Sequence, residues 1–449
     1  SRRRRERYLS GFERSETDEF ARGARALVVY PELPGRASVG PESRLAEAEG
    51  LALAIGLNVV RKKHYRVRSP RAVTLLGGGQ VEEIAEMGRE LEADLLIVDA
   101  SLTAIQQRNL EERTGLKTID RTGLILEIFG ERAATAEGRL QVELAHLDYQ
   151  AGRLVRSWTH LERQRGGFGF LGGPGETQIE ADRRMIRDRM ARLRRELEEV
   201  KRTRSLHRAR RKRAPWPVIA LVGYTNAGKS TLFNKLTRAT VLAEDMLFAT
   251  LDPTMRQIAL PGVEKAILSD TVGFVSDLPT QLIAAFRATL EEVISADIVV
   301  HVRDISHPET DSQRDDVLQI LRDLGVIDDA DAGNQPCMVE LWNKMDLLED
   351  DRRDELSGIS GRDDTVLMIS AETGEGVDAF KAHLSALIAK GNDVRTVKLR
   401  ADDGAALAWL HGRGTVTHQI VDGETVSVDV SLSRQLWGQF EKQFTQLEA

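Results

Sequence analysis

The stretch from Val218 to Ser230 is Val-Ile-Ala-Leu-Val-Gly223-Tyr-Thr-Asn-Ala-Gly228-Lys229-Ser230. Five apolar residues come first, and the remaining eight match the pattern G-x-x-x-x-G-K-[ST], which joins a strand to a helix in proteins that bind phosphate groups. Such glycines let the backbone wrap around a β-phosphate, the lysine neutralises charge on the β- and γ-phosphates, and the hydroxyl binds Mg²⁺. The stretch therefore predicts an α/β domain with a nucleotide site at the end of a strand. Taken alone, it leaves ATP, GTP or a nucleotide kinase open.

Three further motifs, each after a strand-like stretch, decide which nucleotide fits. Asp270-Thr-Val-Gly273 fits the Asp-x-x-Gly element, in which the carboxylate reaches Mg²⁺ through water and the glycine amide contacts the γ-phosphate. Asn343-Lys-Met-Asp346 fits Asn-Lys-x-Asp, whose aspartate accepts hydrogen bonds from guanine N1–H and N2–H together, a pair of donors that adenine lacks. Ser370-Ala-Glu372 then supplies backbone amides for guanine O6. Four motifs in this order and spacing predict a GTP-binding domain.

The length and composition of the chain predict several domains. At 449 residues it exceeds the usual domain size of about 100–200 residues, and 41% hydrophobic with 30% charged residues is ordinary for a globular protein. The predicted fold class is multidomain α/β. The predicted segments are a disordered basic tail (1–24), an N-terminal α/β domain (25–134), a helical hairpin with a glycine-rich tip (135–213), a GTPase domain (214–392) and a small C-terminal α+β domain (393–449).

The predicted N-terminal domain alternates strand-like and helix-like stretches. The strand candidates are Ala26–Tyr30, Ala72–Leu76 and Asp94–Asp99, while Gln80–Leu91 and Leu102–Thr114 show helical periodicity. Because such alternation is typical of strands joined by helical crossovers, we expect a parallel sheet.

Two apolar seams with a glycine-rich segment between them predict a long antiparallel helical hairpin. The first seam runs through Leu140–Leu161 and the second through Ile179–Val200, while Gly166–Gly175 cannot continue a helix. Between Ala151 and Arg213 the sequence has 19 Lys/Arg against 8 Asp/Glu, a net charge of +11 in a chain whose total is −7. An arm of that polarity is a candidate for binding nucleic acid, and the alternative is an ordinary solvated helical face.

Composition argues against several other classes of protein. No apolar run approaches the roughly 20 residues that span a bilayer, so we expect no membrane anchor. The single cysteine, Cys337, cannot form an internal disulfide, and its place in the apolar stretch Pro336–Trp342 predicts a buried structural thiol. The nine histidines show no spacing typical of zinc ligands. Acidic residues follow the arginine-rich start, unlike in a transit peptide, so we expect a cytoplasmic protein.

The nucleotide motifs resemble those of the translation-factor-related GTPases. Four more stretches stand out: Asp120-Arg-Thr-Gly-Leu-Ile-Leu126, Trp158-Thr-His-Leu-Glu-Arg163, Gly175-Glu-Thr-Gln178 and Phe248-Ala-Thr-Leu-Asp-Pro-Thr254. Together with the nucleotide motifs, these stretches are similar to the HflX family. The resemblance extends over about Ala26 to Gly391. It implies a GTP hydrolase that binds the large ribosomal subunit and its RNA and splits stalled or hibernating ribosomes into subunits. We expect a monomer that has no membrane partner.

The resemblance also implies roles for individual residues. The expected switch I threonine is Thr250, with Thr254 as the alternative. The expected catalytic residues are Lys229, Thr250 and Gly273. The expected Mg²⁺ ligands are Ser230, Thr250 and Asp270. The residues expected to contact the nucleotide are Gly223, Tyr224, Thr225, Asn226, Ala227, Gly228, Lys229, Ser230, Thr231, Phe248, Ala249, Thr250, Leu251, Asp252, Asp270, Thr271, Val272, Gly273, Asn343, Lys344, Met345, Asp346, Ser370, Ala371 and Glu372.

Two departures from related GTPases bear on mechanism. Phe274 stands where many of them carry a glutamine that orients water, so we expect hydrolysis to be slow and dependent on a partner. The hairpin tip carries Phe168 and Phe170 and lacks an arginine that other HflX members are expected to have there. Stacking on unpaired bases is therefore the predicted contact of the tip, and the alternative is that both rings fold back as a cap.

Two smaller features each have two interpretations. Asn226 holds the fourth position of the phosphate loop, where some GTPases ligate potassium, and the alternative is an asparagine that stabilises the loop. Gly77–Gly79 lies between a strand candidate and a helix candidate, where backbone amides bind anions. Since some HflX members are reported to bind ATP in this domain, these glycines are a candidate ATP site, and the alternative is a tight turn.

Three functions remain open from the sequence. The first is an enzyme that converts GTP binding and hydrolysis into ribosome remodelling. The second is a nucleotide-gated RNA-binding assembly factor in which hydrolysis is incidental. The third is an RNA-modifying enzyme with a regulatory GTPase domain, but the sequence shows no catalytic cluster outside Trp216–Gly391 that would support it.

Overall fold

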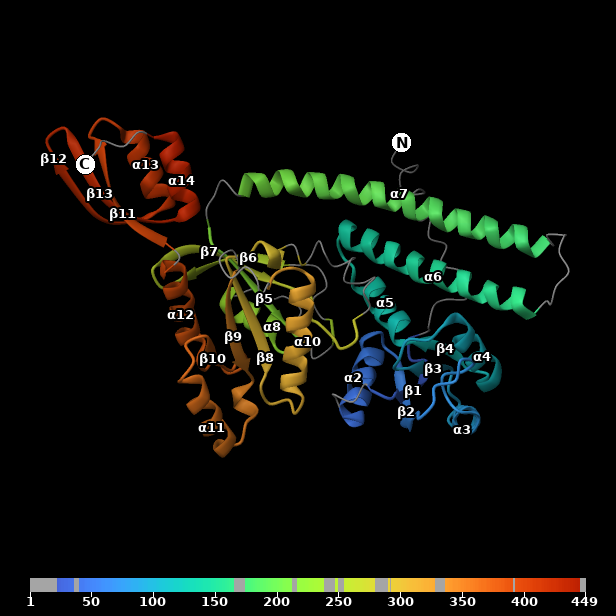
Figure 1. Cartoon of the computed structure of the whole chain (residues 1–449). Helices are drawn as coiled ribbons and strands as arrows, with labels where there is room; N and C mark the ends of the chain where they lie inside the picture. Colours follow the sequence, from blue (N-terminus) through green and yellow to red (C-terminus); the bar gives the residue numbers. More distant parts are fainter. Residues whose placement is uncertain are drawn as a thin grey trace. The chain divides into compact units, whose positions relative to one another are not determined.

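The computed structural model describes residues 22–35, 40–164, 174–211, 216–237, 247–248, 254–278, 290, 292–327, 336–390 and 392–444 (Figure 1). The chain divides into two compact units. The first holds the chain up to Ala133, Val142–Met190 and, remote in sequence, Leu247 and Phe248. The second holds Ala134–Gln141 and most of the chain from Ala191 onward.

The first unit is built on a four-stranded parallel sheet, in the order β2-β1-β3-β4. Its strands are β1 (Arg25–Glu32), β2 (Asn58–Arg66), β3 (Leu95–Val98) and β4 (Lys117–Asp120). Its helices are α2 (Pro41–Ala54), α3 (Gly78–Glu90), α4 (Ala104–Thr114) and α5 (Arg121–Arg132). Helix α2 contacts α5, and α3 contacts α4. Every residue of β3 is buried, as expected of a central parallel strand that helices cover on both faces.

The predicted strand Ala72–Leu76 is wrong. Its residues form a tight turn in which Thr74 Oγ1 donates to the carbonyl oxygen of Leu76 and Leu75 has a left-handed φ of 64°. The turn is apolar because Leu75 and Leu76 fill the core of the unit. The second strand in chain order is Asn58–Arg66, which lies at the edge of the sheet. Because it contains several Arg and Lys residues, it does not form an apolar run in the sequence.

Local signals in the sequence set the ends of α4. Thr103 Oγ1 accepts a hydrogen bond from the amide of Gln106, and Gln106 Oε1 accepts one from the amide of Thr103. This reciprocal capping satisfies two backbone donors at the start of the helix. Gly115, with a φ of 72°, ends it in the left-handed conformation that glycine adopts without strain.

Two long helices form the middle of the chain, α6 (Ala136–Gln164) and α7 (Pro174–Arg211). Arg189 Nε donates to Glu143 Oε1 at 2.7 Å, which ties the start of α6 to the middle of α7. Val142 precedes Glu143 in the sequence and Met190 follows Arg189, and both apolar side chains are buried. The predicted glycine-rich tip, with Phe168 and Phe170, lies outside the described residues apart from its last two positions.

The second unit contains a six-stranded sheet in the order β10-β9-β8-β5-β7-β6, in which only β6 is antiparallel to its neighbour. The strands are β5 (Val218–Gly223), β6 (Thr254–Leu260), β7 (Val263–Asp270), β8 (Ile298–Asp304), β9 (Cys337–Asn343) and β10 (Val366–Met368). The helical elements are α8 (Lys229–Thr237), α10 (Thr310–Asp323), η1 (Met345–Leu347), α11 (Asp350–Ser360) and α12 (Val377–Lys390). The strand order reverses at β5, so the carboxyl end of β5 is the edge at which such sheets bind ligands.

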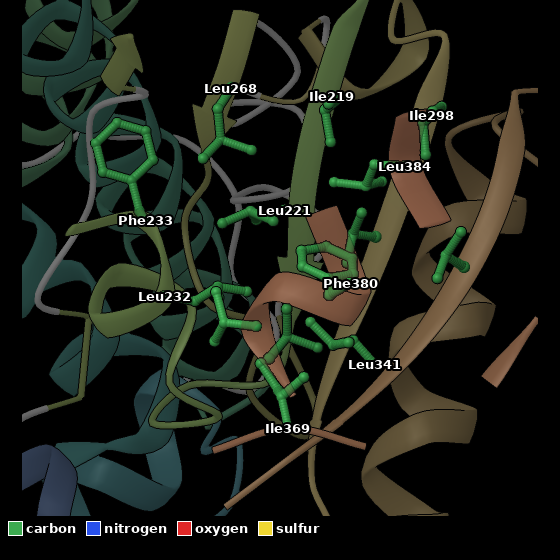
Figure 2. Packing of buried hydrophobic residues seen from close by; sticks show 14 of the residues in the cluster. Ile219, Leu221, Leu232, Phe233, Leu268, Ile298, Leu341, Ile369, Phe380 and Leu384 are labelled. Atoms are coloured by element: carbon green, nitrogen blue, oxygen red, sulfur yellow. The ribbon is translucent and has the colours of Figure 1, made fainter. Parts of the chain in front are cut away.

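The core of this sheet lies under α12 (Figure 2). Phe380 and Leu384 of α12 pack with Ile219 and Leu221 of β5 and Leu341 of β9, all of them at most 3% exposed. Burying each such side chain contributes about 1.5–3 kcal/mol. The strands are thereby held rigid beneath the loops that leave their carboxyl ends.

The prediction that Cys337 is buried is wrong. Cys337 is the first residue of β9 and is exposed, whereas Val339 and Leu341 further along the strand are buried. The apolar run covers the whole strand, but burial begins only at its third residue, Val339.

The chain ends in a three-stranded antiparallel sheet of order β11-β13-β12, which confirms the predicted α+β domain. Its elements are β11 (Asn392–Arg400), α13 (Gly404–Arg413), β12 (Thr415–Asp422), β13 (Thr425–Ser433) and α14 (Arg434–Gln443). Trp437 and Phe440 of α14 are at most 1% exposed and form part of a core separate from that of the six-stranded sheet. Among the described helices, none has a stretch apolar and long enough to cross a membrane.

Candidate functional site

The phosphate loop joins the carboxyl end of β5 to α8, and two of its glycines meet neighbouring strands closely. A Cβ at Gly223, whose φ is +151°, would lie 2.2 Å from the carbonyl oxygen of Val302. A Cβ at Gly228, whose φ is +92°, would lie 2.1 Å from Nδ2 of Asn343. A larger residue at either position would force the loop away from β8 or β9. The loop backbone is thus held in shape by strands that are far away in sequence.

Lys229 opens α8 and is 6% exposed. Its Nζ donates hydrogen bonds to the carbonyl oxygens of Gly223 at 3.1 Å and Tyr224 at 2.7 Å. Burial lowers the pKa of Lys229 to about 8, and the negative charge of Asp270 opposes that shift. A bound phosphate would add negative charge and favour the ammonium form.

Ser230 and Asp270 bring two oxygen ligands together. Because β7 runs parallel to β5, its last residue Asp270 reaches the phosphate loop, and Ser230 Oγ donates to Asp270 Oδ2 at 2.7 Å. The hydroxyl of Thr225, in the same loop, is buried without a hydrogen-bond partner in the described part of the chain. Hydroxyl and carboxylate oxygens are ligands that Mg²⁺ prefers, so the residues present fit the predicted magnesium site. Thr231 follows in α8 and is half-buried.

The segment after β7 lies against the phosphate loop. Thr271 and Val272 are buried, and Thr271 Oγ1 donates to a backbone carbonyl of β5 at 2.7 Å. A Cβ at Gly273 would lie 2.7 Å from Cγ2 of Thr225, so only glycine fits there without a shift. Phe274 is 1% exposed and has no group that could orient a water molecule.

Asn343 connects the phosphate loop to the loops expected to bind the base through two hydrogen bonds. Its Nδ2 donates to the carbonyl oxygen of Ala227 at 2.8 Å, and its Oδ1 accepts from the amide of Ala371 at 2.9 Å. Asn343 is 2% exposed, so both bonds are shielded from water. One side chain therefore fixes three of the predicted motifs relative to one another.

Lys344 has a left-handed φ of 66°, and its Nζ lies 2.8 Å from Asp304 Oδ2. The other carboxylate oxygen of Asp304 accepts from the amide of Ser306 at 3.0 Å and from its hydroxyl at 2.5 Å. Neither Asp304 nor Ser306 belongs to one of the four nucleotide motifs of the sequence. The available signal was position, because Asp304 ends a strand next to β5 at the ligand-binding edge.

The remaining base-binding residues follow on η1 and the loop after β10. Met345 is buried, and its amide donates to the carbonyl oxygen of Ile369 at 3.2 Å, while Asp346 beside it is exposed. Ser370 and Ala371 are buried in the turn after the strand. The carbonyl oxygen of Glu372 accepts from Lys235 Nζ at 3.0 Å, which ties this turn to α8.

The predicted nucleotide site also includes Asn226, Phe248 and Ala249–Asp252. Asn226 is exposed with a left-handed φ of 60°. Phe248 belongs to the first unit, in which its ring packs edge-on against Phe129 with a centroid separation of 4.6 Å. Ala249–Asp252, including Thr250, lie outside the described residues.

The predicted anion loop of the first unit begins α3. Gly77 precedes the helix, and its amide donates to Gln80 Oε1 at 2.8 Å, which occupies one of the donors there. At the carboxyl ends of β3 and β4, arginines already neutralise Asp99 and Asp120. Arg121 pairs with Asp99 at 2.5 Å, and Arg153 pairs with Asp120 at 2.9 Å.

Three family models match the chain. One described as GTP-binding GTPase N-terminal matches residues 42–130, and one described as GTP-binding GTPase Middle Region matches residues 132–211. A third, described as 50S ribosome-binding GTPase, matches residues 218–344.

Individual relatives extend these matches along the chain. A GTPase HflX from Magnetococcus marinus is 50% identical over 380 residues, 85% of this chain and 85% of that protein. A GTPase HflX from Escherichia coli K12 is 40% identical over 392 residues, 84% of this chain and 89% of that protein. Among solved structures, a GTP-binding protein from Sulfolobus solfataricus in complex with GDP is 22% identical over 82% of this chain and 99% of its own, with a TM-score of 0.44.

Proposed function

Because the chain belongs to the HflX family of GTPases, we propose that it couples GTP binding and hydrolysis to the splitting or rescue of stalled or idle ribosomes. The protein is a GTP hydrolase of a 50S ribosome-binding family. The observation that carries the proposal is the match of residues 218–344 to that family, in a domain whose phosphate and base motifs are braced together by Asn343. The large ribosomal subunit and its RNA are the proposed partners, in the cytoplasm.

Each residue of the site has its own role toward the phosphates, the metal ion or the attacking water. Lys229 neutralises phosphate charge, and the amide of Gly273 donates to the γ-phosphate. Ser230 and Asp270, with Thr250, would hold Mg²⁺, which when bound neutralises the charge of the β- and γ-phosphates. Because Phe274 is buried and apolar, no side chain at its position orients the attacking water, so hydrolysis depends on a partner.

The two long helices supply the proposed contact with RNA. Residues 151–213 carry a net charge of +11, and within the described part of α7 the residues Arg187, Arg192 and Arg194 are exposed. Arginines that neutralise phosphates bind RNA without sequence preference and lose affinity as salt rises. GTP ordering of the switch segments would then set how tightly the protein holds the subunit.

The deciding experiment follows ribosome splitting by light scattering with the full-length protein. With GTP we expect repeated rounds of splitting, and with a non-hydrolysable analogue a single round limited by the amount of protein. The Lys229→Ala variant serves as the control that cannot bind nucleotide productively. Binding to precursor subunits without any splitting would instead favour the assembly factor. Splitting that recycles equally well with the analogue would contradict a role for hydrolysis.

Two further ligands, potassium and ATP, belong to the proposal. Potassium is proposed beside Asn226, and rates of hydrolysis in KCl and NaCl at equal ionic strength test it: faster turnover in KCl is expected, and equal rates would remove the ion from the proposal. ATP is proposed at the loop Gly77–Gly79, where backbone amides open α3.

A further inference from the structure

Asp304 is fixed in direction by the turn that follows β8. It is the last residue of β8 and pairs with Asn343 at the end of β9, where the amide of Ile305 donates to the carbonyl oxygen of Asn343 at 3.1 Å. Its Oδ1 accepts from the amide of Ser306 at 3.0 Å and from the Ser306 hydroxyl at 2.5 Å. Two donors on one carboxylate oxygen restrict rotation of the side chain, so the position of the other oxygen is fixed as well.

The other oxygen of this carboxylate binds Lys344. Lys344 Nζ lies 2.8 Å from Asp304 Oδ2, and the two side chains are only 22% and 13% exposed. Because both are largely shielded from water, salt and solvent screen this pair less than a pair on the surface. Lys344 has a left-handed φ of 66°, which is unfavourable for a residue with a Cβ and persists where surrounding contacts hold it. The ion pair with Asp304 is one of these contacts.

The residues on both sides of Lys344 are bonded to other loops of the site. The side chain of Asn343 binds the phosphate loop and the turn after β10, and the amide of Met345 donates to the carbonyl oxygen of Ile369 at 3.2 Å. These bonds hold the backbone of the motif, but the flexible four-carbon stem of Lys344 is held at its far end by Asp304. Without the ion pair, the side chain would sample many rotamers.

We propose that Asp304, oriented by Ser306, is a positioning residue that holds the Lys344 side chain in place for the guanine nucleotide. The inference rests on the proposed role of Asn343–Asp346 in binding the base. A nucleotide that needs the lysine in one arrangement binds with an apparent affinity reduced by the fraction of protein in that arrangement. If the lysine without its partner keeps this arrangement about a tenth of the time, affinity falls about 10-fold.

The direction of the effect separates positioning from charge. Asp304→Asn removes a negative charge, and long-range attraction alone would then strengthen the binding of an anionic nucleotide. An asparagine amide has one oxygen, so it cannot accept from Ser306 and from Lys344 on separate atoms. We therefore expect Asp304→Asn to lower GDP affinity about 10-fold, opposite to the effect of charge. Ser306→Ala keeps the charge and loosens the carboxylate, so it should lower GDP affinity about 2- to 5-fold.

The test is a double-mutant cycle on the full-length protein, in which titration with fluorescently labelled GDP gives the affinities. Lys344→Met keeps an apolar stem, removes the ammonium and should also weaken binding about 10-fold. Asp304→Asn should cause no further loss when it is added to Lys344→Met, because the carboxylate acts through the ammonium. The matched control is Asp363→Asn, just before β10. The Asp363 carboxylate accepts from the amide and the hydroxyl of Thr365 in the same pattern, and this variant should bind GDP as wild type does.

The outcomes distinguish this proposal from the role of the motif itself. Normal GDP affinity in Lys344→Met would remove the base-binding role of the lysine and the proposal with it. Weak binding in Lys344→Met together with normal binding in Asp304→Asn would overturn the proposal alone. A further loss in the double variant would mean that Asp304 supports the fold and does not act through Lys344. If Asp304→Asn does not fold, Ser306→Ala decides, and its normal affinity would overturn the proposal.

Discussion

Asp346 is the residue expected to select guanine. It is exposed on η1 and directly follows Met345, which is buried. A carboxylate that accepts from two ring donors discriminates strongly, since a mismatched base leaves those groups unpaired, and sites of this kind reach about 10⁴. Asp346→Asn should lower affinity for GDP on the order of 100-fold and raise affinity for xanthosine diphosphate, whose C2 oxygen can accept from the new amide.

Nucleotide titrations of both diphosphates measure this preference. The matched control is Asp350→Asn, which removes a nearby exposed carboxylate at the start of α11. Normal GDP affinity in Asp346→Asn would show that another residue reads the base.

Lys229 gives the nucleotide-free protein a pH dependence with a defined sign. Its pKa falls from 10.5 in the unfolded chain to about 8 in the folded protein because it is buried. Between these two values the unfolded chain binds more protons than the folded one, so the free energy of unfolding rises with pH in this window. Below about pH 8 both states are charged and the cost of burying the ammonium is complete.

Urea unfolding at about pH 7.5 and about pH 9.5 tests this expectation. From the lower to the higher pH, the free energy of unfolding of wild type should rise by about 1–2 kcal/mol more than that of Lys229→Met, because the variant has no group to titrate at this position. A parallel change in the two proteins would place the pKa of Lys229 at its ordinary value.

At the scale of elements, the helical hairpin is predicted to carry the mechanical part of the function. Its arms are α6 and α7, and the ion pair of Glu143 with Arg189 joins them. At 1.5 Å per residue, about 22 residues reach roughly 33 Å, which is long enough to extend a tip well beyond the point where the helices meet. Base stacking on each phenylalanine of the tip would contribute about 1–3 kcal/mol.

Phe168→Ala combined with Phe170→Ala should therefore leave GDP affinity unchanged. It should weaken binding to the large subunit on the order of 10-fold or more, and reduce splitting and ribosome-stimulated hydrolysis with it. The matched control is Leu53→Ala with Ile359→Ala, which removes two exposed apolar side chains elsewhere. If the tip variant matched wild type in all three ribosome assays, the rings would be a cap on the helices and not a contact with RNA.

At the scale of the whole molecule, the C-terminal domain has a core of its own. The buried cluster around Trp437 and Phe440 shares no residue with the cluster under α12. A chain ended at Lys390 should therefore bind GDP within about 2-fold of wild type, since changes at distant sites without shared partners are nearly independent. Titration of the truncated protein measures this. A large loss would mean that β11 supports α12 and, through it, the sheet below the site.

The sequence by itself determined the GTPase domain, and it predicted the residues of the site from contiguous motifs. Each motif is contiguous, and its chemistry depends on backbone amides and on one or two side chains a few residues apart, as in Gly223–Ser230. Such motifs can be recognised without knowing which strands are neighbours. The periodicity of the long helices and the apolar runs of the central strands are likewise local, because helix and strand repeats follow from the geometry of one element.

Tertiary structure alone decided what joins these pieces. The contact of Asn343 with Ala227 spans 116 residues, and that of Tyr224 with Ser276 spans 52. Neither follows from spacing, because packing of the sheet determines which loops meet. The charged edge strand Asn58–Arg66 and the exposed Cys337 were missed for a related reason. The position of a residue in the folded sheet decides whether it is buried. An apolar run therefore does not show that each of its residues is buried, and a charged run does not exclude an edge strand.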